Sequence, residues 1–279
     1  MNTTHTTTPT LLDERLADTQ QAFDSVAADY DGPRGNNIAI QDMRAEMWRW
    51  LEASFAPGSR LIDLGCGTGL DAVHLAGQGH QVTATDWSPG MVARTRERAE
   101  QAGLSVDTHV LGAHELQHLP GEGRFDGAYS NLGPLNCVPD LTAVAAECAR
   151  LIRPGGRLVF TVIGRWCPWE IAHYARQRRW QRLAVRFARE TVAVGMNGRT
   201  IWTRYYTPAE FYAAFQPHFA LEVQRGLCVF VPPPYLTGLA ERHPRWHQRL
   251  WALDRRVAGW PGINRLGDHF LLVMRRRDS

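Results

Sequence analysis

The chain has 279 residues, and its hydrophobic fraction of 44% is ordinary for a globular protein. It contains no run of 18 apolar residues, and residues 1–10 are polar and rich in threonine, so we expect neither a membrane-spanning helix nor a secretory signal. We interpret residues 1–10 as a disordered tail. The five cysteines form no C-x-x-C pair, which favours a reduced, cytoplasmic protein.

Charge is distributed unevenly along the chain. The formal net charge is +3, and all 31 basic residues are arginine. Residues 1–149 carry a formal charge of −11, whereas residues 150–279 carry +14. A basic half can attract an anionic substrate, a carrier protein, a membrane or a nucleic acid. It can equally be the solvated surface of arginine-rich helices, and the sequence leaves these alternatives open.

A strand, a tight turn and a helix are predicted in succession over residues 61–76. The strand is apolar, and the turn Gly65–Gly69 has glycine at every second position. Glycine lets the backbone take a positive φ and approach a ligand closely. The first N–H groups of the helix point back at this turn. The next predicted strand, residues 81–85, ends in Asp86, where a carboxylate can accept both hydroxyl groups of a ribose.

The remaining elements follow from apolar periodicity and from residues that begin or end helices. Ser88 with Pro89, and Asp140, are typical of helix starts, and an arginine-rich helix is predicted to end at Glu190. The other predicted helices cover residues 11–28, 40–55, 88–102, 140–151 and 207–215. The other predicted strands cover residues 105–110, 125–130, 157–163, 220–231 and 268–275, with an extended run at 200–206 and turns at 153–156 and 195–198.

Four motifs stand out along residues 63–158. They are Asp63-Leu-Gly-Cys-Gly-Thr-Gly, Thr85-Asp-Trp-Ser-Pro-Gly-Met, Arg124-Phe-Asp-Gly-Ala-Tyr-Ser-Asn and Arg150-Leu-Ile-Arg-Pro-Gly-Gly-Arg-Leu. They resemble, in the family's order, the motifs of the class I S-adenosylmethionine-dependent methyltransferases, of the type that acts on small molecules. The resemblance covers about residues 20–164.

The resemblance implies a Rossmann-like α/β fold. In this fold a seven-stranded, mostly parallel sheet has helices on both faces, and its last strand is antiparallel. Residues 11–279 would form a single methyltransferase domain with insertions at about residues 165–206 and 232–267. We interpret these insertions as helical lids, because the first follows directly after the fifth predicted strand of the sheet.

The resemblance also implies S-adenosylmethionine as the cofactor. Many relatives have aspartate where Ala113 stands, so in this chain the backbone must make the contact with the adenine amino group. Arg34 is a weaker candidate for contact with the methionine carboxylate. The residues expected to bind the cofactor are Tyr30, Asp63, Gly65, Cys66, Gly67, Gly69, Asp86, Trp87, Met91, Ala113, His114, Asn131 and Leu132.

Candidates for the acceptor site come from their order along the chain. Aromatic side chains of the first insertion can stack on a planar substrate, although the tryptophans can also form a simple packing cluster. Glu170 and His173 are candidates for the base that takes the acceptor's proton. His173 can equally be an ordinary residue of a helix surface. The residues expected to bind the acceptor are Asn136, Trp166, Trp169, Tyr205 and Tyr206.

One further motif points to a metal. His114-Glu115-Leu-Gln-His118 matches the zinc-protease signature H-E-x-x-H, which needs both histidines on one face of a stable helix. Pro120 and Gly121 limit this helix to barely one turn, and no third ligand follows at a suitable spacing. We therefore expect no metal.

Three functions are compatible with the sequence. The first is methylation of a small-molecule oxygen, nitrogen or carbon nucleophile in secondary or specialised metabolism. The second is methylation of a carrier-bound acyl group, a lipid or RNA through the basic half. An acidic carrier protein is a candidate partner, whereas we do not expect nucleic acid because no separate RNA-binding module is visible. The third is a non-catalytic binding protein or an oxidoreductase, but a nicotinamide enzyme would show G-x-G-x-x-G. The acceptor atom and the oligomeric state are not encoded in any motif.

Overall fold

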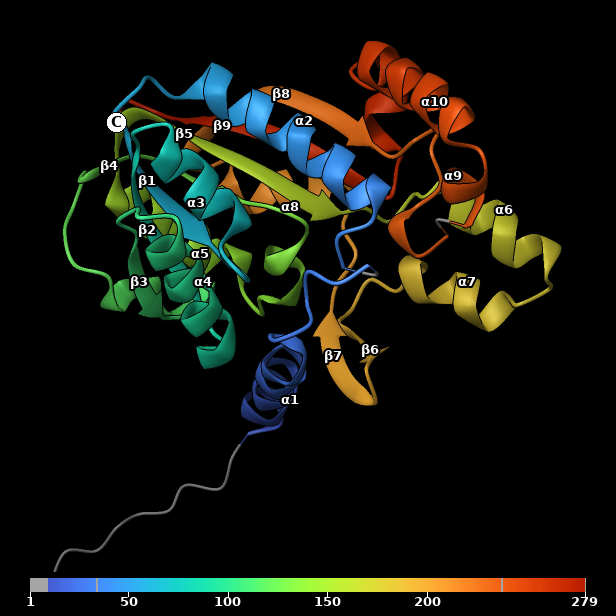
Figure 1. Cartoon of the computed structure of the whole chain (residues 1–279), viewed down its shortest axis with the longest axis horizontal. Helices are drawn as coiled ribbons and strands as arrows, with labels where there is room; N and C mark the ends of the chain where they lie inside the picture. Colours follow the sequence, from blue (N-terminus) through green and yellow to red (C-terminus); the bar gives the residue numbers. More distant parts are fainter. Residues whose placement is uncertain (1–9, 34, 237, 279) are drawn as a thin grey trace, which may run out of the picture.

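The computed structural model describes residues 10–33, 35–236 and 238–278 (Figure 1). Residues 1–9 of the expected tail and Arg34, the weaker carboxylate candidate, lie outside the described residues. Thr10 is not part of a tail, because it caps helix α1 (Leu11–Val26). The Thr10 hydroxyl accepts from the Asp13 N–H, and the Asp13 carboxylate accepts from the Thr10 N–H at 2.9 Å.

Seven strands form one sheet in the order β3-β2-β1-β4-β5-β9-β8. The first five strands in this order run parallel to one another, and β9 is antiparallel to both β5 and β8. This confirms the predicted sheet with its antiparallel last strand. The strands are β1 (Arg60–Leu64), β2 (Gln81–Asp86), β3 (Asp107–Val110), β4 (Phe125–Ser130), β5 (Ile152–Ile163), β8 (Phe219–Leu227) and β9 (His269–Arg276).

Strand β5 begins five residues earlier than the predicted strand over residues 157–163. Phe125 pairs with Ile152, but Gly127 pairs with Arg157, so the segment between them is a bulge within the strand. The residues predicted as a turn, 153–156, make up this bulge. The glycines and the proline therefore mark an irregular backbone at these residues, as predicted, but they do not mark the start of the strand.

Helices cover both faces of the sheet, as predicted, and an apolar cluster lies beneath each set (Figure 1). Met47 of α2 packs in one cluster with Leu271, and Phe211 of α8 packs in the other with Leu272. Successive side chains of a strand point to opposite faces, so β9 contributes to both cores. The helices around the sheet are α2 (Ile38–Ser54), α3 (Leu70–Gly77), α4 (Pro89–Gln101), α5 (Leu141–Leu151) and α8 (Pro208–Phe215).

The two predicted insertions contain structure of their own. Residues 165–206 hold the helices α6 (Pro168–Arg176) and α7 (Trp180–Phe187) and a hairpin of β6 (Val192–Met196) and β7 (Arg199–Thr203). Residues 232–267 hold the helices η3 (Pro234–Leu236), α9 (Gly238–Arg242), α10 (Pro244–Val257) and η4 (Ile263–Arg265).

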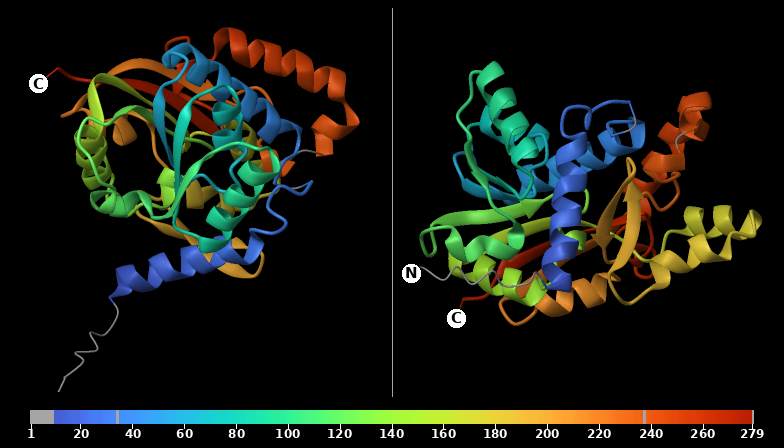
Figure 2. Two further views of the ribbon diagram at one scale, coloured as in Figure 1. Left: turned by 60° about the vertical axis from the view of Figure 1, so that its left-hand side comes forward. Right: turned by 90° about the horizontal axis from the view of Figure 1, so that it is seen from below.

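The hairpin and the helices of these insertions lie in different places. Strand β7 packs along α1, whereas α6, α7 and α10 lie together at one end of the molecule (Figure 2). Within the described residues, every helix is too short or too polar to cross a lipid bilayer.

Candidate functional site

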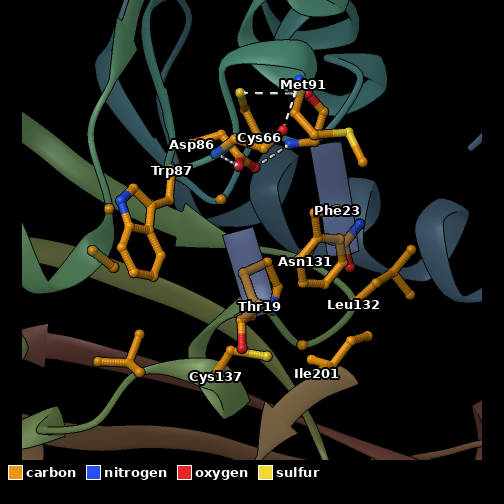
Figure 3. Close-up of a pocket in the computed structure, with 18 of the residues that line it drawn as sticks. Thr19, Phe23, Cys66, Asp86, Trp87, Met91, Asn131, Leu132, Cys137 and Ile201 are labelled. Carbon is orange, nitrogen blue, oxygen red and sulfur yellow. Dashed lines mark hydrogen bonds between the residues drawn. The ribbon is translucent and has the colours of Figure 1, made fainter. Parts of the chain in front are cut away.

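A cavity of about 320 Å³ opens at the carboxyl ends of β1, β2 and β4 (Figure 3). This is the edge at which open α/β sheets bind ligands, and the volume is typical of a small-molecule pocket. Helix α1, the hairpin β6–β7 and two short helices, η1 (Ala113–His118) and η2 (Pro134–Cys137), contribute the rest of the wall.

The turn between β1 and α3 contains three glycines at positive φ, namely Gly65 at 83°, Gly67 at 54° and Gly69 at 82°. A Cβ atom at Gly65 would lie 2.3 Å from Pro134, and one at Gly69 would lie 2.8 Å from Thr95, so packing requires glycine at both. A Cβ atom at Gly67 would meet no atom within 4 Å, and Gly67 lines the cavity. Gly67 is therefore where the turn leaves room for a bound molecule.

Asp86 ends β2 beside this turn. Its Oδ2 accepts a hydrogen bond from the Gly67 N–H, and its Oδ1 accepts one from the Ser88 N–H, both at 2.9 Å. Burial raises the pKa of the Asp86 carboxyl, although these backbone N–H groups act in the opposite direction. Each carboxylate oxygen keeps a lone pair, so Asp86 can accept hydrogen bonds from two further hydroxyl groups.

A second polar group of the wall is the Arg44 guanidinium of α2. Its Nε lies 3.2 Å from Oδ1 of Asp71, and both side chains are 11% exposed. Asp71 also accepts from Nε1 of Trp48 at 2.7 Å and from Nδ2 of Asn131 at 3.0 Å. The buried carboxylate therefore holds a cation at the cavity wall.

Trp87 and His114 meet edge to face, with ring centroids 4.5 Å apart. Burial lowers the pKa of His114, which keeps its imidazole neutral at pH 7. His114 lies in the 3₁₀ helix η1, where residues four apart do not share a face. Glu115 caps this helix by accepting from the Gly112 N–H at 2.9 Å. The H-E-x-x-H segment therefore lacks the geometry of the zinc signature, since His118 points elsewhere.

The wall formed by α1 and the hairpin is largely apolar, and we call its residues named below the acceptor wall. The two elements are joined by a hydrogen bond from the Trp202 N–H to Oγ1 of Thr19 at 3.0 Å, and the Arg15 guanidinium lies 4.3 Å from the Trp202 ring centroid. The first insertion thus reaches the cavity through its hairpin and Tyr205, not through α6 or α7. The residues of the acceptor wall are Thr19, Phe23, Val194, Met196, Ile201 and Thr203.

Most residues predicted to bind the cofactor come together in this cavity. Asp63 and Gly69 do not line it: Asp63 is buried beneath the turn, and Gly69 packs against Thr95. Their roles are to support the turn from behind. The predicted residues that line the cavity are Tyr30, Gly65, Cys66, Gly67, Asp86, Trp87, Met91, Ala113, His114, Asn131 and Leu132.

The predicted acceptor set needs correction. Tyr205 lines the cavity, but Asn136 holds the backbone together: its amide donates to the carbonyls of Ile163 and Arg204 at 3.0 and 2.7 Å. The three other aromatic residues also lie outside the cavity wall. Trp166 packs on Phe187, the Trp169 indole donates to the Phe230 carbonyl, and Tyr206 packs in the core against Phe211.

The predicted general bases are also displaced from the cavity. Glu170 is buried in α6, where its Oε2 accepts from Nε of Arg186 at 2.5 Å and from the Tyr235 hydroxyl. Nε2 of His173 lies 2.9 Å from Nε2 of Gln177 on the same helix. Neither side chain lines the cavity, so the structure does not bring the two predicted bases to this site. The order of residues along the insertion could not show that α6 turns away from the sheet edge.

The sequence analysis missed two groups of lining residues. Arg44 and Asp71 stand on amphipathic helices, where nothing in the spacing separates them from ordinary surface charges. The residues of β6 and β7 belong to the predicted first insertion, and their alternation would have identified a hairpin. Which of its faces meets α1 depends on tertiary packing.

Comparisons with known proteins agree with this geometry. Residues 61–156 match a family model described as a methyltransferase domain. A ubiquinone biosynthesis O-methyltransferase of Xanthomonas axonopodis pv. citri (strain 306) is 36% identical over 138 residues, which are 49% of this chain and 56% of that protein. The chain thus spans about half the length of the curated relatives that it matches.

Solved structures share the fold over nearly the whole chain. The 1,6-didemethyltoxoflavin-N1-methyltransferase of Burkholderia thailandensis, with bound S-adenosylhomocysteine, has a TM-score of 0.58 at 20% identity and covers 98% of this chain and 93% of its own. The [4+2]-cyclase SpnF has a TM-score of 0.60 at 18% identity and covers 97% of both chains. Identities this low establish the fold alone.

The sheet order defines a Rossmann-like domain, and its cavity lies at the carboxyl edge, where such sheets bind their ligands. Residues 61–156 match the model of a methyltransferase domain, and S-adenosylmethionine is the cofactor of the class I methyltransferases that the motifs and the sheet order resemble. The residues fit this group, because Gly67 leaves open space where the backbone must approach it and Asp86 has free acceptor capacity for its ribose.

Proposed function

We propose that the protein transfers a methyl group from S-adenosylmethionine to a small, largely apolar acceptor. The observation that carries this proposal is one continuous cavity with two chemically different walls. Gly67, Asp86 and Arg44 supply polar groups on one side, and the acceptor wall supplies apolar side chains on the other. A cofactor bound at the polar wall would therefore face an acceptor bound against the apolar wall.

We assign the polar wall to the cofactor. Asp86 would accept the ribose hydroxyl groups, and Arg44 would pair with the methionine carboxylate, as a guanidinium does in a charge-assisted contact. Trp87, Met91 and His114 would enclose the adenine. These assignments are supported by the lining of the cavity, by the hydrogen bond from the Gly67 N–H that fixes Asp86, and by the ion pair with Asp71 that fixes Arg44.

When bound, the cofactor supplies an electrophilic methyl carbon. The acceptor's nucleophilic atom would take this methyl group, S-adenosylhomocysteine would be the leaving group, and the acceptor's proton would pass to water. The task of the protein is to align the reactants and exclude water. Burial raises the pKa values of Cys137 and Tyr205 to about 12, so both stay protonated and can donate hydrogen bonds but cannot take the proton at pH 7.

The acceptor that we propose first is a hydroxyl group on an apolar ring. The curated relatives are named as ubiquinone biosynthesis O-methyltransferases, which supports oxygen as the acceptor atom. The basic half of the chain brings no described arginine to the cavity wall: its lining residues are Ile163, Val194, Met196, Ile201, Thr203 and Tyr205. This favours an uncharged small molecule over RNA or a phosphate-bearing carrier.

Two measurements test the proposal in sequence. Isothermal titration calorimetry with S-adenosylhomocysteine should show saturable, one-to-one binding. Incubation with S-adenosylmethionine and a panel of catechols, phenols and naphthols should then release S-adenosylhomocysteine, measured by mass spectrometry, only when an acceptor is present. Binding without transfer to any acceptor would remove the enzymatic role, which the shared fold with a cyclase makes a real outcome. The absence of binding would remove the cofactor as well.

A further inference from the structure

Helix α7 buries a charged side chain and exposes an aromatic one. Arg186 is buried, donating from Nε to Glu170 and from another nitrogen to Asp268, while Trp180 at the start of the helix is 60% exposed. The apolar residues follow the spacing i, i+3, i+4 and i+7, so they share one face of the helix. Trp180 and Ala184 of this face are exposed, and Leu183 and Phe187 are half-buried.

Helix α10 likewise buries polar and charged side chains and exposes apolar ones. His247 is buried, with Nε2 2.6 Å from Oδ2 of Asp42, and Asp254 is buried as an acceptor for backbone N–H groups. The outer face instead carries Trp246 and Leu253, seven residues apart and 50% and 40% exposed. Trp260, just beyond the helix, is 56% exposed. Both helices therefore present apolar side chains that the rest of the described chain leaves uncovered.

Arginine surrounds these exposed tryptophans. Residues 171–189 contain six arginines and no acidic residue. Figures 1 and 2 place α6, α7 and α10 at the same end of the molecule, which we call the basic aromatic end. Its exposed arginines without an ion-pair partner among the described residues are Arg176, Arg178, Arg179, Arg182, Arg189, Arg245, Arg249 and Arg256.

We propose that the basic aromatic end docks on the surface of a lipid bilayer that contains anionic lipid. Tryptophan favours the boundary between headgroups and acyl chains, and arginine is attracted to anionic headgroups. A short helix with one apolar and one basic face lies in that boundary with its apolar face inward. Trp180 and Trp246 would enter the boundary, and the arginines beside them would contact headgroup phosphates.

Two other occupants fit the same residues less well. A second copy that docks symmetrically through the same end would bring arginines against arginines, which costs free energy. Single-stranded RNA would stack on tryptophan, but Leu183 and Leu253 offer nothing to a base and gain only from an apolar environment. Charge complementarity and aliphatic exposure together therefore select an anionic bilayer.

Co-sedimentation with vesicles tests the proposal. The whole chain is mixed with vesicles of phosphatidylcholine alone or with an equal amount of phosphatidylglycerol. Binding is expected only with phosphatidylglycerol, with a blue shift of tryptophan emission and a decline as salt rises. The triple variant Arg178→Gln/Arg179→Gln/Arg182→Gln should bind about 100-fold more weakly, at roughly one tenfold step per one or two arginines. Trp180→Ser and Trp246→Ser should each lose the part of the blue shift that they contribute.

The matched control is Arg60→Gln/Arg94→Gln/Arg96→Gln, which removes the same charge from β1 and α4, where Arg60 and Arg96 are exposed and Arg94 is half-buried. It should bind vesicles nearly as the unaltered chain does. Equal binding to both vesicles, no binding to either, or equal loss in both triple variants would overturn the proposal. So would RNA binding or dimer formation that the α7 variants abolish in the absence of vesicle binding. Affinity for S-adenosylhomocysteine, measured on every variant, reports folding and the cofactor site separately.

Discussion

The Gly67 N–H donates to Oδ2 of Asp86 at 2.9 Å, and this bond joins the turn after β1 to the tip of β2. Gly67 has φ +54°, which favours glycine, and the Thr95 hydroxyl donates to its carbonyl at 2.8 Å. Both peptide groups around Gly67 are therefore fixed before any ligand arrives. A site assembled in this way needs little reordering on binding, which limits the entropy lost.

Asp86→Ala should weaken S-adenosylhomocysteine binding by about 10- to 100-fold. The variant removes a charged acceptor for two hydroxyl groups, and hydrogen bonds to a charged group contribute about 1.5–3 kcal/mol. Calorimetry on the variant measures the change. Glu100→Ala, which removes an exposed carboxylate of α4, is the control and should bind as the unaltered chain does. Equal affinity in both variants would remove Asp86 from the cofactor site.

Binding of S-adenosylhomocysteine should also weaken as pH falls. Burial raises the pKa of Asp86 above that of an exposed aspartate, and only the carboxylate accepts from both ribose hydroxyl groups. Affinity is thus full well above the raised pKa and is lost as pH falls through it. Calorimetry from pH 8 down to pH 4.5 should show this decline for the unaltered chain and a flat profile for Asp86→Asn. A parallel decline in both would place the titrating group elsewhere.

Arg44→Met should separate the contributions of the methionine end and the adenosine end of the cofactor to binding. The variant keeps an unbranched chain about as long as the arginine chain up to Nε but removes the cation that we assign to the methionine carboxylate. Affinity for S-adenosylhomocysteine should fall about tenfold or more, because a charge-assisted contact is lost. Affinity for 5′-methylthioadenosine, which lacks the amino-acid group, should stay the same. Loss of both affinities would show that Arg44 supports the fold of the wall through Asp71 rather than the ligand.

The sequence predicted the parts of the site that depend on local geometry. Gly65 to Gly69 and Asp86 stand where strands end, so adjacent parallel strands place them together whatever the rest of the chain does. Position in space could not be predicted for Glu170 and Tyr205, which lie in one insertion. Tyr205 reaches the cavity because the chain returns beside β5 at the Gly164–Tyr206 bridge, while α6 diverges with Glu170. Long-range pairing of this kind leaves no periodic signal.

Ile201→Trp should reduce methyl transfer without changing S-adenosylhomocysteine affinity. Ile201 is on the acceptor wall, and a larger side chain would fill space that we assign to the acceptor. The expected result is a higher KM for the acceptor in the panel assay, while calorimetry with the cofactor product is unchanged. Val194→Ala, at the position paired with Ile201 on the neighbouring strand, enlarges the cavity and should broaden the range of acceptors. A lower cofactor affinity in Ile201→Trp would mean that the two compartments are not separate.

Arg186→Met should destabilise the protein by about 3–5 kcal/mol, because it leaves Glu170 and Asp268 buried without their cation. Burial alone would raise the pKa of Asp268, but the Arg186 guanidinium and His269 hold it well below its usual range. The ion pair therefore stabilises the fold above the ordinary pKa of aspartate, and this contribution is lost as pH falls further. Urea unfolding at pH 7 and pH 3 should show a gap between the unaltered chain and Arg186→Met that narrows at pH 3.

Glu170→Gln keeps an oxygen that can accept from Arg186 and Tyr235, so its cost at pH 7 should be smaller than that of Arg186→Met. His173→Ala, on the half-exposed side of the same helix, should change the free energy of unfolding by less than about 0.5 kcal/mol. Because neither side chain reaches the cavity, both variants should keep the pH profile of methyl transfer. A shifted profile in Glu170→Gln, with stability unchanged, would return Glu170 to the reaction and contradict the structural role that its ion pair gives it.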